Sequence, residues 1–383
     1  MKIAIVGCFP PSKQGLNEYN CHLSRAIGEL GHKCIAISNM LTDIEKKNLK
    51  KVKCTKVMIR RIWKFDSYFS WYNIVKLIRK EKPDVVIFSL IFSSFSFRGY
   101  RSFVNLLTPA LVKFTGFKTA IILHHLYENI DMGTYGKTRI AIFKIGCNLI
   151  TRSFKLVDKV FVLVERYREF LESRYRAKNV RYVSHGCFLK LEEPLPYKKS
   201  KNVLVMGKFG AYKKLDRIIE MVKELSDEDS DIKLIIAGRS HPYFKGHVEE
   251  VLEHALHNFI DFRGYVLEEH LPALFSDINV VVIPYDFYTG TSGIAHLAVN
   301  YGRPIVAYDS LEIEDLIENI GVRIARVPIG DETAFKARIK DYLNDFEKQK
   351  TDGVHNFRVG QKIYLSNIAK EIIDKTLSRE NEK

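Results

Sequence analysis

Short apolar runs alternate along this chain with longer segments whose apolar residues recur every three or four positions. The short runs predict buried strands at residues 2–6, 33–38, 84–88, 118–123, 159–164 and 180–183, and the longer spacing predicts a helix at 17–30. Strands that alternate with helices form βαβ units, in which helices cover a parallel sheet. Residues 1–190 are therefore expected to form a doubly wound, Rossmann-like α/β domain.

The alternation stops at residues 191–201 and then starts again. This segment, LEEPLPYKKSK, has two prolines and no apolar periodicity, which indicates a linker. Residues 202–355 then predict a second Rossmann-like domain, with strands at 202–206, 233–237, 260–263, 280–284 and 304–308. The last part, 356–383, predicts one amphipathic helix that packs back on the first domain. Two such domains are expected to bind ligands in a cleft, at the carboxyl ends of their strands.

Composition narrows the protein class. The chain has 383 residues, of which 46% are hydrophobic and 27% charged, so neither disorder nor a low-complexity fibre is plausible. Residues 1–200 hold 36 Lys and Arg against 15 Asp and Glu, whereas the remaining residues hold 24 against 30. This asymmetry predicts an anionic partner for the first half, either nucleic acid or phospholipid headgroups. A merely solvated basic face is the simpler alternative.

Cysteines and apolar stretches exclude other classes. The six cysteines lie far apart, without a CxxC pair or zinc spacing, so neither a disulfide framework nor a metal site is indicated. The longest apolar stretch, at 85–97, is shorter than the ~20 residues of a membrane span. The apolar start is too short for a signal peptide and suits a first strand. We therefore expect a cytoplasmic protein that associates peripherally with a membrane.

A glycine-containing loop precedes a predicted helix in the second domain. Gly290, Thr291, Ser292 and Gly293 follow the strand that ends at Pro284. Glycines allow close approach of the backbone, and unpaired amides at a helix start favour an anion such as a diphosphate. An ordinary helix cap is the alternative, since Thr and Ser are common N-caps.

Lysines follow the first strand of the same domain. Gly207 and Lys208 begin the turn after that strand, and Lys213 comes five residues after Lys208. Lysines at the carboxyl end of a parallel strand can meet the phosphates that the glycine loop binds. The sequence thus predicts a diphosphate site on the second domain.

Further short motifs occur in a fixed order along both domains. They are FPP at 9–11 with GLNE at 15–18, HHLY at 124–127, SHG at 184–186, GK at 207–208 with KK at 213–214, IAG at 236–238, FRGY at 262–265 and GRPIV at 302–306. This ordered set resembles the retaining glycosyltransferases of the GT-B fold, in the family-4-like group (glycosyltransferase group 1). The resemblance extends over nearly the whole chain.

The resemblance implies a nucleotide-sugar-dependent hexosyltransferase that retains the anomeric configuration. We expect that no cofactor or metal is needed, because the lysines and a helix dipole would supply the positive charge. His124 would support the transferring centre, and Gly15, Leu16 and Asn17 would bind the acceptor. The donor, a UDP- or GDP-sugar, would be bound by Gly207, Lys208, Lys213, Gly238, Tyr265, Gly290, Thr291, Ser292, Gly293 and His296.

The chain departs from the family at one point. The family carries two glutamates around the phosphate loop, and the matching positions here hold Thr289 and Leu297. Asp286 is proposed to replace the first glutamate at the sugar as a catalytic residue, and His296 the second at the ribose. The alternative is a catalytically impaired relative that binds nucleotide-sugar or a partner transferase.

Aromatic and basic residues are interleaved at 58–82, a segment that contains both Trp63 and Trp71. This mixture suits a helix lying on an anionic membrane, where a lipid-linked or glycan acceptor would be met. Packing of the aromatics in the core is the alternative. Base stacking is a third use, but no RNA-binding motif accompanies the segment, so no nucleic-acid partner is expected.

Overall fold

The computed structural model describes residues 1–12, 14–47, 57–127, 137–210, 213–241, 244–253, 258–285 and 292–378. The chain divides into two units. The first comprises Met1–His185 and the C-terminal segment from Leu365, and the second comprises Gly186–Tyr288 and Ser292–Tyr364. Each unit contains one parallel sheet with flanking helices, so the predicted fold class, two Rossmann-like α/β domains, is confirmed.

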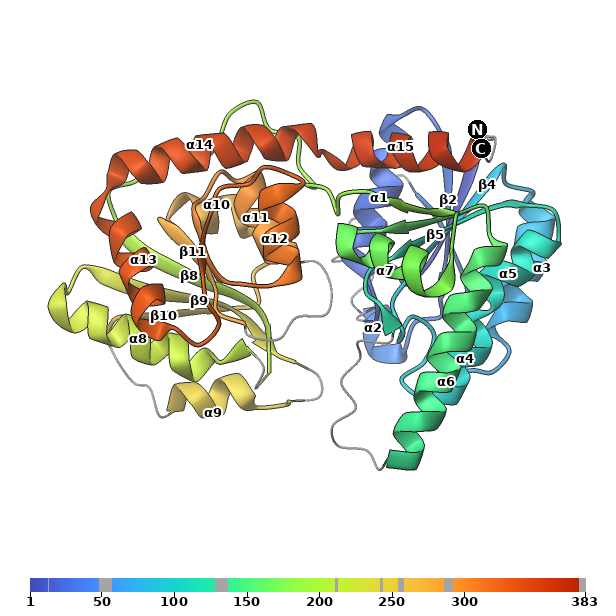
Figure 1. The fold of residues 1–383 in the computed structure, drawn as a ribbon, viewed down its shortest axis with the longest axis horizontal. Coiled ribbons are helices and arrows are strands. Elements are labelled where there is room, and N and C mark those ends of the chain that lie inside the picture. Colours follow the sequence, from blue (N-terminus) through green and yellow to red (C-terminus); the bar gives the residue numbers. More distant parts are fainter. Residues whose placement is uncertain are drawn as a thin grey trace. The chain divides into compact units, whose positions relative to one another are not determined.

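The first unit is built on a seven-stranded sheet in the order β3-β2-β1-β4-β5-β6-β7 (Figure 1). Its strands are β1 (Lys2–Val6), β2 (Lys33–Asn39), β3 (Met58–Trp63), β4 (Val85–Leu90), β5 (Lys118–Leu123), β6 (Lys159–Val162) and β7 (Val180–Tyr182). All pairs are parallel. The strand order reverses between β1 and β4, which is where α/β sheets bind ligands.

Helices cover both faces of this sheet. They are α1 (Asn17–Glu29), α2 (Asp43–Lys47), α3 (Ser70–Glu81), α4 (Gly99–Leu106), α5 (Thr108–Phe114), α6 (Lys137–Ser153), α7 (Glu165–Tyr175) and α15 (Leu365–Leu377), with a short 3-10 helix η3 at Phe154–Leu156. The C-terminal α15 packs beside α1.

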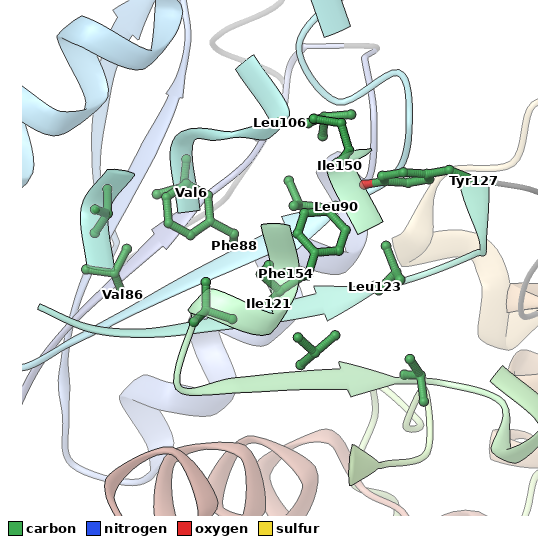
Figure 2. Close-up of a cluster of buried hydrophobic side chains, with 14 of the residues drawn as sticks. Val6, Val86, Phe88, Leu90, Leu106, Ile121, Leu123, Tyr127, Ile150 and Phe154 are labelled. Carbon is green, nitrogen blue, oxygen red and sulfur yellow. The ribbon is translucent and has the colours of Figure 1, made fainter. Parts of the chain in front are cut away.

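The strands of the first unit are buried because both faces are covered, as their nearly continuous apolar sequences require. Figure 2 shows side chains from the sheet and from the helices meeting in one cluster, which includes Val86, Phe88 and Leu90 of β4. Each such side chain contributes about 1.5–3 kcal/mol when it is fully buried.

The structure corrects the interpretation of residues 58–82. Met58–Trp63 is the edge strand β3, which the sequence analysis missed, and not part of a membrane helix. Trp63 is fully buried and its ring packs 5.7 Å from that of Phe95. Arg61 donates hydrogen bonds to backbone carbonyls, including that of Asn39 at 3.2 Å. The core alternative is therefore correct for Trp63, whereas Phe69 and Tyr72 at the start of α3 are exposed.

The second unit repeats the architecture with six parallel strands in the order β10-β9-β8-β11-β12-β13. They are β8 (Lys201–Phe209), β9 (Ile232–Ser240), β10 (Ile260–Gly264), β11 (Val280–Ile283), β12 (Ile305–Tyr308) and β13 (Ile324–Val327). The helices are α8 (Leu215–Glu228), α9 (His247–Glu253), α10 (Leu271–Ser276), α11 (Gly293–Asn300), α12 (Leu311–Glu318), α13 (Glu332–Asn344) and α14 (Phe346–Lys362), with a 3-10 turn η5 at Glu268–His270. The strand order reverses between β8 and β11.

The segment predicted as a linker packs on the second unit. Arg303 is fully buried and donates to the carbonyl oxygen of Pro196 at 2.8 Å, while the hydroxyl of Tyr197 donates to that of Gly302 at 2.8 Å. The first unit ends at His185, five residues before the expected boundary.

The expectation of one helix across residues 356–383 is wrong. The helix α14 begins earlier, at Phe346, and ends at Lys362, and α15 begins at Leu365. The break has a physical cause, because the carbonyl of Ile363 accepts from the amide of Cys187 at 2.9 Å and Tyr364 forms a parallel bridge with Cys187. The helix α15 belongs to the first unit and packs beside α1.

Two further findings concern cysteines and membrane spans. Cys8, Cys34, Cys147 and Cys187 are free thiols. Over the residues that the structure describes, no helix combines the length and the apolar character needed to cross a bilayer.

Candidate functional site

Side chains of the second unit gather where β8 and β11 end, at the reversal of strand order. Lys213 follows β8 and Tyr285 follows β11, and the amine of Lys213 donates to the Tyr285 hydroxyl at 3.0 Å. The same hydroxyl donates to the carbonyl oxygen of Met206 at 3.1 Å. The lysine amine also lies 4.3 Å from the centroid of the Tyr285 ring. The aromatic ring and its hydroxyl therefore fix the position of the amine.

Lys213 is only 7% exposed, and this burial lowers its pKa to about 7. The positive charge of Lys208 acts in the same direction, whereas Glu312 opposes it. A buried amine with such a pKa gains its proton easily when an anion binds beside it, because the opposite charge favours the charged form. Lys208 itself is exposed, so the two predicted lysines differ in setting.

Two predicted glycines permit this arrangement through their lack of a side chain. Gly207 has φ +139°, and a Cβ there would lie 2.4 Å from the Lys213 amine. Gly238, in β9, has φ +145°, and a Cβ there would lie 1.9 Å from the carbonyl oxygen of Gly207. Neither position accepts another residue without a shift of the backbone or of the lysine.

Glu312 is a residue of this site that sequence reasoning missed. It lies in the first turn of α12, is 5% exposed, and one carboxylate oxygen, Oε1, has no hydrogen-bond partner among the described residues. Burial raises its pKa well above the usual value, Asp315 adds to the rise, and Lys213 opposes it. The sequence offered one signal for Glu312. It follows the strand β12, which lies next to β11 in the sheet, so its helix begins near the same edge as Tyr285.

His241 was also missed. Its amide donates to the carbonyl oxygen of Phe209 at 2.6 Å, which ties the end of β9 to the end of β8. Its pKa is lowered by partial burial and then by the charges of Lys208 and Lys213. Because both lysines influence its pKa, His241 lies within electrostatic range of Lys208 and Lys213.

The start of α11 is the described part of the predicted phosphate loop. Ser292 caps the helix, since its Oγ accepts from the amide of Ala295 at 3.2 Å. Gly293 has open space around it. His296 is buried, its Nδ1 lies 2.9 Å from the carbonyl oxygen of Ser292, and burial lowers its pKa to about 4. The predicted residues Asp286, Gly290 and Thr291 lie outside the described residues.

Tyr265 follows β10 and is half exposed. The guanidinium of Arg239, on the neighbouring strand β9, lies 4.9 Å from the centroid of its ring. The pair offers an aromatic and a cationic group at the same edge of the sheet as Lys213.

His124 directly follows β5 in the first unit. Its Nε2 lies 3.1 Å from the Ser89 hydroxyl, and its ring makes an edge contact with that of Tyr19, with centroids 4.6 Å apart. The ring of His185 lies 4.9 Å from that of Tyr19. Burial, and then the neighbouring His125, lower the pKa of His124 to about 3. The imidazole is therefore neutral at physiological pH.

The predicted acceptor residues form the turn before α1. Gly15 has φ +55° and approaches the side chain of Cys8, which accounts for a glycine there. Leu16 is the N-cap residue of α1, and the side-chain Nδ2 of Asn17 donates to the carbonyl oxygen of Ser12 at 2.7 Å. Tyr19, which contacts His124, lies in the first turn of the same helix.

The described part of the chain contains no group of three His, Cys, Asp or Glu residues that could hold a metal ion.

Comparison with known proteins gives a match to one family. Residues 200–345 match the family model described as "Glycosyl transferases group 1". This region contains the described residues around Lys213 together with β8 to β13. Among curated proteins, no match is found at the sequence level.

Solved structures of similar fold cover 97–98% of this chain. One is TarM from S. aureus, in a mutant form in complex with Fondaparinux, alpha-GlcNAc-glycerol and UDP, with 13% identity, a TM-score of 0.73, and coverage of 98% of this chain and 100% of TarM. Sucrose-phosphate synthase from Thermosynechococcus elongatus is 15% identical, with a TM-score of 0.72 and coverage of 97% of each chain. HepE from Anabaena, in complex with UDP-glucose, is 13% identical, with a TM-score of 0.70 and coverage of 98% of each chain.

Proposed function

We propose that this chain is a GT-B glycosyltransferase that transfers a sugar, with retention of configuration, from a UDP- or GDP-sugar to a lipid-linked or glycan acceptor, and the match of residues 200–345 to glycosyl transferases group 1 supports this proposal. The observation that carries the proposal is the buried amine of Lys213, held by Tyr285 at the reversal of strand order in the second unit. The donor would bind there, and the acceptor would bind on the first unit at Gly15, Leu16 and Asn17.

Departure of the nucleoside diphosphate is the step that needs positive charge. The ammonium of Lys213, with Lys208 nearby, would bind the diphosphate and stabilise the charge that develops as the bond to the sugar breaks. Binding of the diphosphate would also keep Lys213 protonated above its pKa of about 7. The N-terminal end of the α11 dipole would add to the positive potential. We therefore propose that no metal or other cofactor is needed.

His124 would contact the donor sugar as a neutral group. A histidine whose pKa is about 3 cannot act as a cation near pH 7, so its role would be to accept or donate a hydrogen bond. Asp286 is proposed to orient the donor sugar in place of the family's first glutamate, and His296 to stand in at the ribose. Gly238 and Tyr265 would line the nucleotide side.

The proposed acceptor and its location rest on charge. The first 200 residues hold 36 basic and 15 acidic residues, which favours adsorption to an anionic surface. TarM and HepE were solved with UDP or UDP-glucose, which supports a nucleotide-sugar donor here. We propose a peripheral enzyme at the cytoplasmic membrane face.

One assay tests this function. The purified chain is incubated with UDP- and GDP-sugars and a membrane extract, release of the nucleotide is measured, and the configuration of the product is determined by NMR. We expect release with one donor and a retained configuration. Lys213→Met should slow release by about 10²–10³, and Lys233→Met, which removes an exposed lysine of β9, should leave the rate unchanged.

A second candidate function is favoured by the missing glutamates. Leu297 occupies the position of the second glutamate, and its side chain packs against the apolar core of the second unit. A catalytically impaired relative would bind nucleotide-sugar, or a partner transferase, without turnover. Thermal stabilisation by UDP or GDP without nucleotide release from any donor would support this alternative.

A further inference from the structure

The first unit carries two exposed apolar stripes on neighbouring helices. The first stripe runs along α4 and α5 and consists of Tyr100, Val104, Leu107, Leu111 and Phe114, which are 37–72% exposed. Their spacing of four, three, four and three residues places them on one helical face. Leu107, between the two helices, has helical backbone angles (φ −76°, ψ −11°), so the face continues across the junction.

The second stripe lies on α6 and the turn that follows it. Ile142, Ile145 and Leu149 are 64%, 61% and 60% exposed, and Leu156 of η3 is 48% exposed. The first three recur at helical spacing. The opposite side of the same helix is also apolar and packs against the core. The helix α6 therefore has two apolar faces, and only one of them is buried within this unit.

Both stripes lie on the same side of the unit. The helices α4–α5 and α6 follow neighbouring parallel strands, so they run back in the same direction (Figure 1). They pack against each other through Phe103 and Phe143, whose rings lie 5.6 Å apart. Figure 2 shows that Leu106, Ile150 and Phe154 of these elements point inward to the core. The two stripes therefore form one surface, which we call the apolar face.

Positive charges predominate around this surface, although Asp66 pairs with Arg98 and Arg101, and Asp158 pairs with Lys113 and Lys118. Residues 85–157 contain nine Lys and Arg but only two acidic residues, Glu128 and Asp131, and none of the four helical elements contains an acidic residue. Lys144, Arg152 and Lys155 are exposed beside the stripe of α6, and no ion pair holds them within the part of the chain that the structure describes. The apolar face is thus bordered by free positive charge.

We propose that the apolar face docks on an anionic phospholipid bilayer, with its side chains at the boundary of headgroups and acyl chains and the bordering Lys and Arg on lipid phosphates. Exposed Phe, Leu and Ile flanked by basic residues on a helix are the composition of interfacial membrane helices. A second copy of the chain would bring the same uncompensated positive charges together, which disfavours self-association.

This inference rests on the proposed function in so far as docking would bring a lipid-linked acceptor to the unit that contains His124. It also changes the expected membrane contact. The sequence favoured residues 58–82, but Trp63 is in the core, and the surface now assigned lies on α4, α5 and α6.

The test is flotation of the full chain with vesicles of phosphatidylcholine alone or with added phosphatidylglycerol, in the absence of any acceptor. We expect binding to the anionic vesicles only. The triple variant Ile142→Gln, Ile145→Gln, Leu149→Gln should bind at least about tenfold more weakly, because three apolar side chains that would leave water at the bilayer have been replaced by polar ones. The control Phe262→Gln, Leu267→Gln, Ile329→Gln removes three exposed apolar side chains of the second unit and should bind like the wild type.

Three outcomes would overturn the proposal. They are a wild type that does not bind anionic vesicles, a triple variant that binds as well as the wild type, and a wild-type dimer in light scattering that the triple variant converts to monomers. Nucleotide-induced thermal stabilisation of the triple variant shows that it is folded. Release of nucleotide from donor sugar in detergent, measured on the same samples, separates failure of docking from failure of the proposed activity.

Discussion

The amine of Lys213 lies 3.0 Å from the hydroxyl of Tyr285, in a part of the second unit where the lysine is almost entirely shielded from water. The tyrosine holds a charge-bearing group in place and at the same time keeps solvent from it. This combination makes the lysine responsive to an anion and dependent on the tyrosine for its position.

Replacement of the two members of this pair should have unequal effects. Lys213→Met removes the charge and should lower kcat by about 10²–10³, the loss seen when one preorganised stabilising donor is removed. Tyr285→Phe keeps the ring and removes only the hydroxyl, so we expect a smaller loss of activity. Steady-state kinetics with the donor found in the release assay would measure both. Equal losses would show that the hydroxyl acts directly on substrate.

Nucleotide affinity should depend on pH through Lys213. Its pKa is lowered to about 7 in the free protein, and a bound diphosphate would raise it. Binding should therefore be tightest below pH 7 and weaken as the pH rises through this value, because the free amine must then take up a proton. Isothermal titration of UDP or GDP between pH 6 and 9 would measure the dependence. Lys213→Met should lack it.

The stability of the free protein should depend on pH in the opposite direction. Because the folded pKa of Lys213 lies below its usual value of 10.5, the unfolded chain binds more protons between about pH 7 and 10.5. The contribution of this lysine to the unfolding free energy consequently rises across that window. Denaturant titrations of wild type and Lys213→Met at pH 7 and 9 would isolate it, and a constant difference between them would contradict the lowered pKa.

Glu312→Gln should shift the pH dependence of nucleotide binding to lower pH. The carboxylate favours the charged form of Lys213, so its replacement by a neutral amide of similar shape removes that support. The same titration applies, with Glu318→Gln as the control because Glu318 is exposed at the end of α12. An unchanged midpoint would mean that Glu312 is already protonated when nucleotide binds.

Gly238→Ala should destabilise the second unit by about 1–3 kcal/mol or more, the cost of a strained backbone conformation. The added Cβ would lie 1.9 Å from the carbonyl oxygen of Gly207, so β8 and β9 would have to separate. Gly293→Ala is the matched control, since open space surrounds that position. Thermal unfolding of both variants would test the difference, and equal melting temperatures would refute the close approach.

Local patterning was enough to predict the two sheets and the lysines at the end of β8. Buried parallel strands are continuous apolar runs, and the residues after them reach the ligand edge regardless of tertiary detail. The strand β3 escaped notice because basic and aromatic residues interrupt its apolar pattern, and its edge position tolerates them. Trp63 at its end is buried by Phe95, a contact that spans 32 residues and leaves no local signal.

Glu312 could not be predicted for a related reason. An acidic residue in the first turn of a helix is normally an exposed partner of the helix dipole. Here the fold places it within the electrostatic reach of Lys213, 99 residues earlier in the chain. Sequence spacing does not encode this kind of proximity. The residues at 286–291, which complete the predicted donor site, stay predictions.

The contact between α4 and α6 depends on the absence of a side chain at position 146. A Cβ on Gly146 would lie 2.4 Å from the ring of Phe103, so any other residue would push the two helices apart. The inward sides of both helices are packed in the core. If the helices moved apart, the ring of Phe103 and the backbone beside it would become exposed between the two outer stripes. Gly146 thus sets how flat and continuous a surface the first unit can present, although the residue itself is not part of that surface.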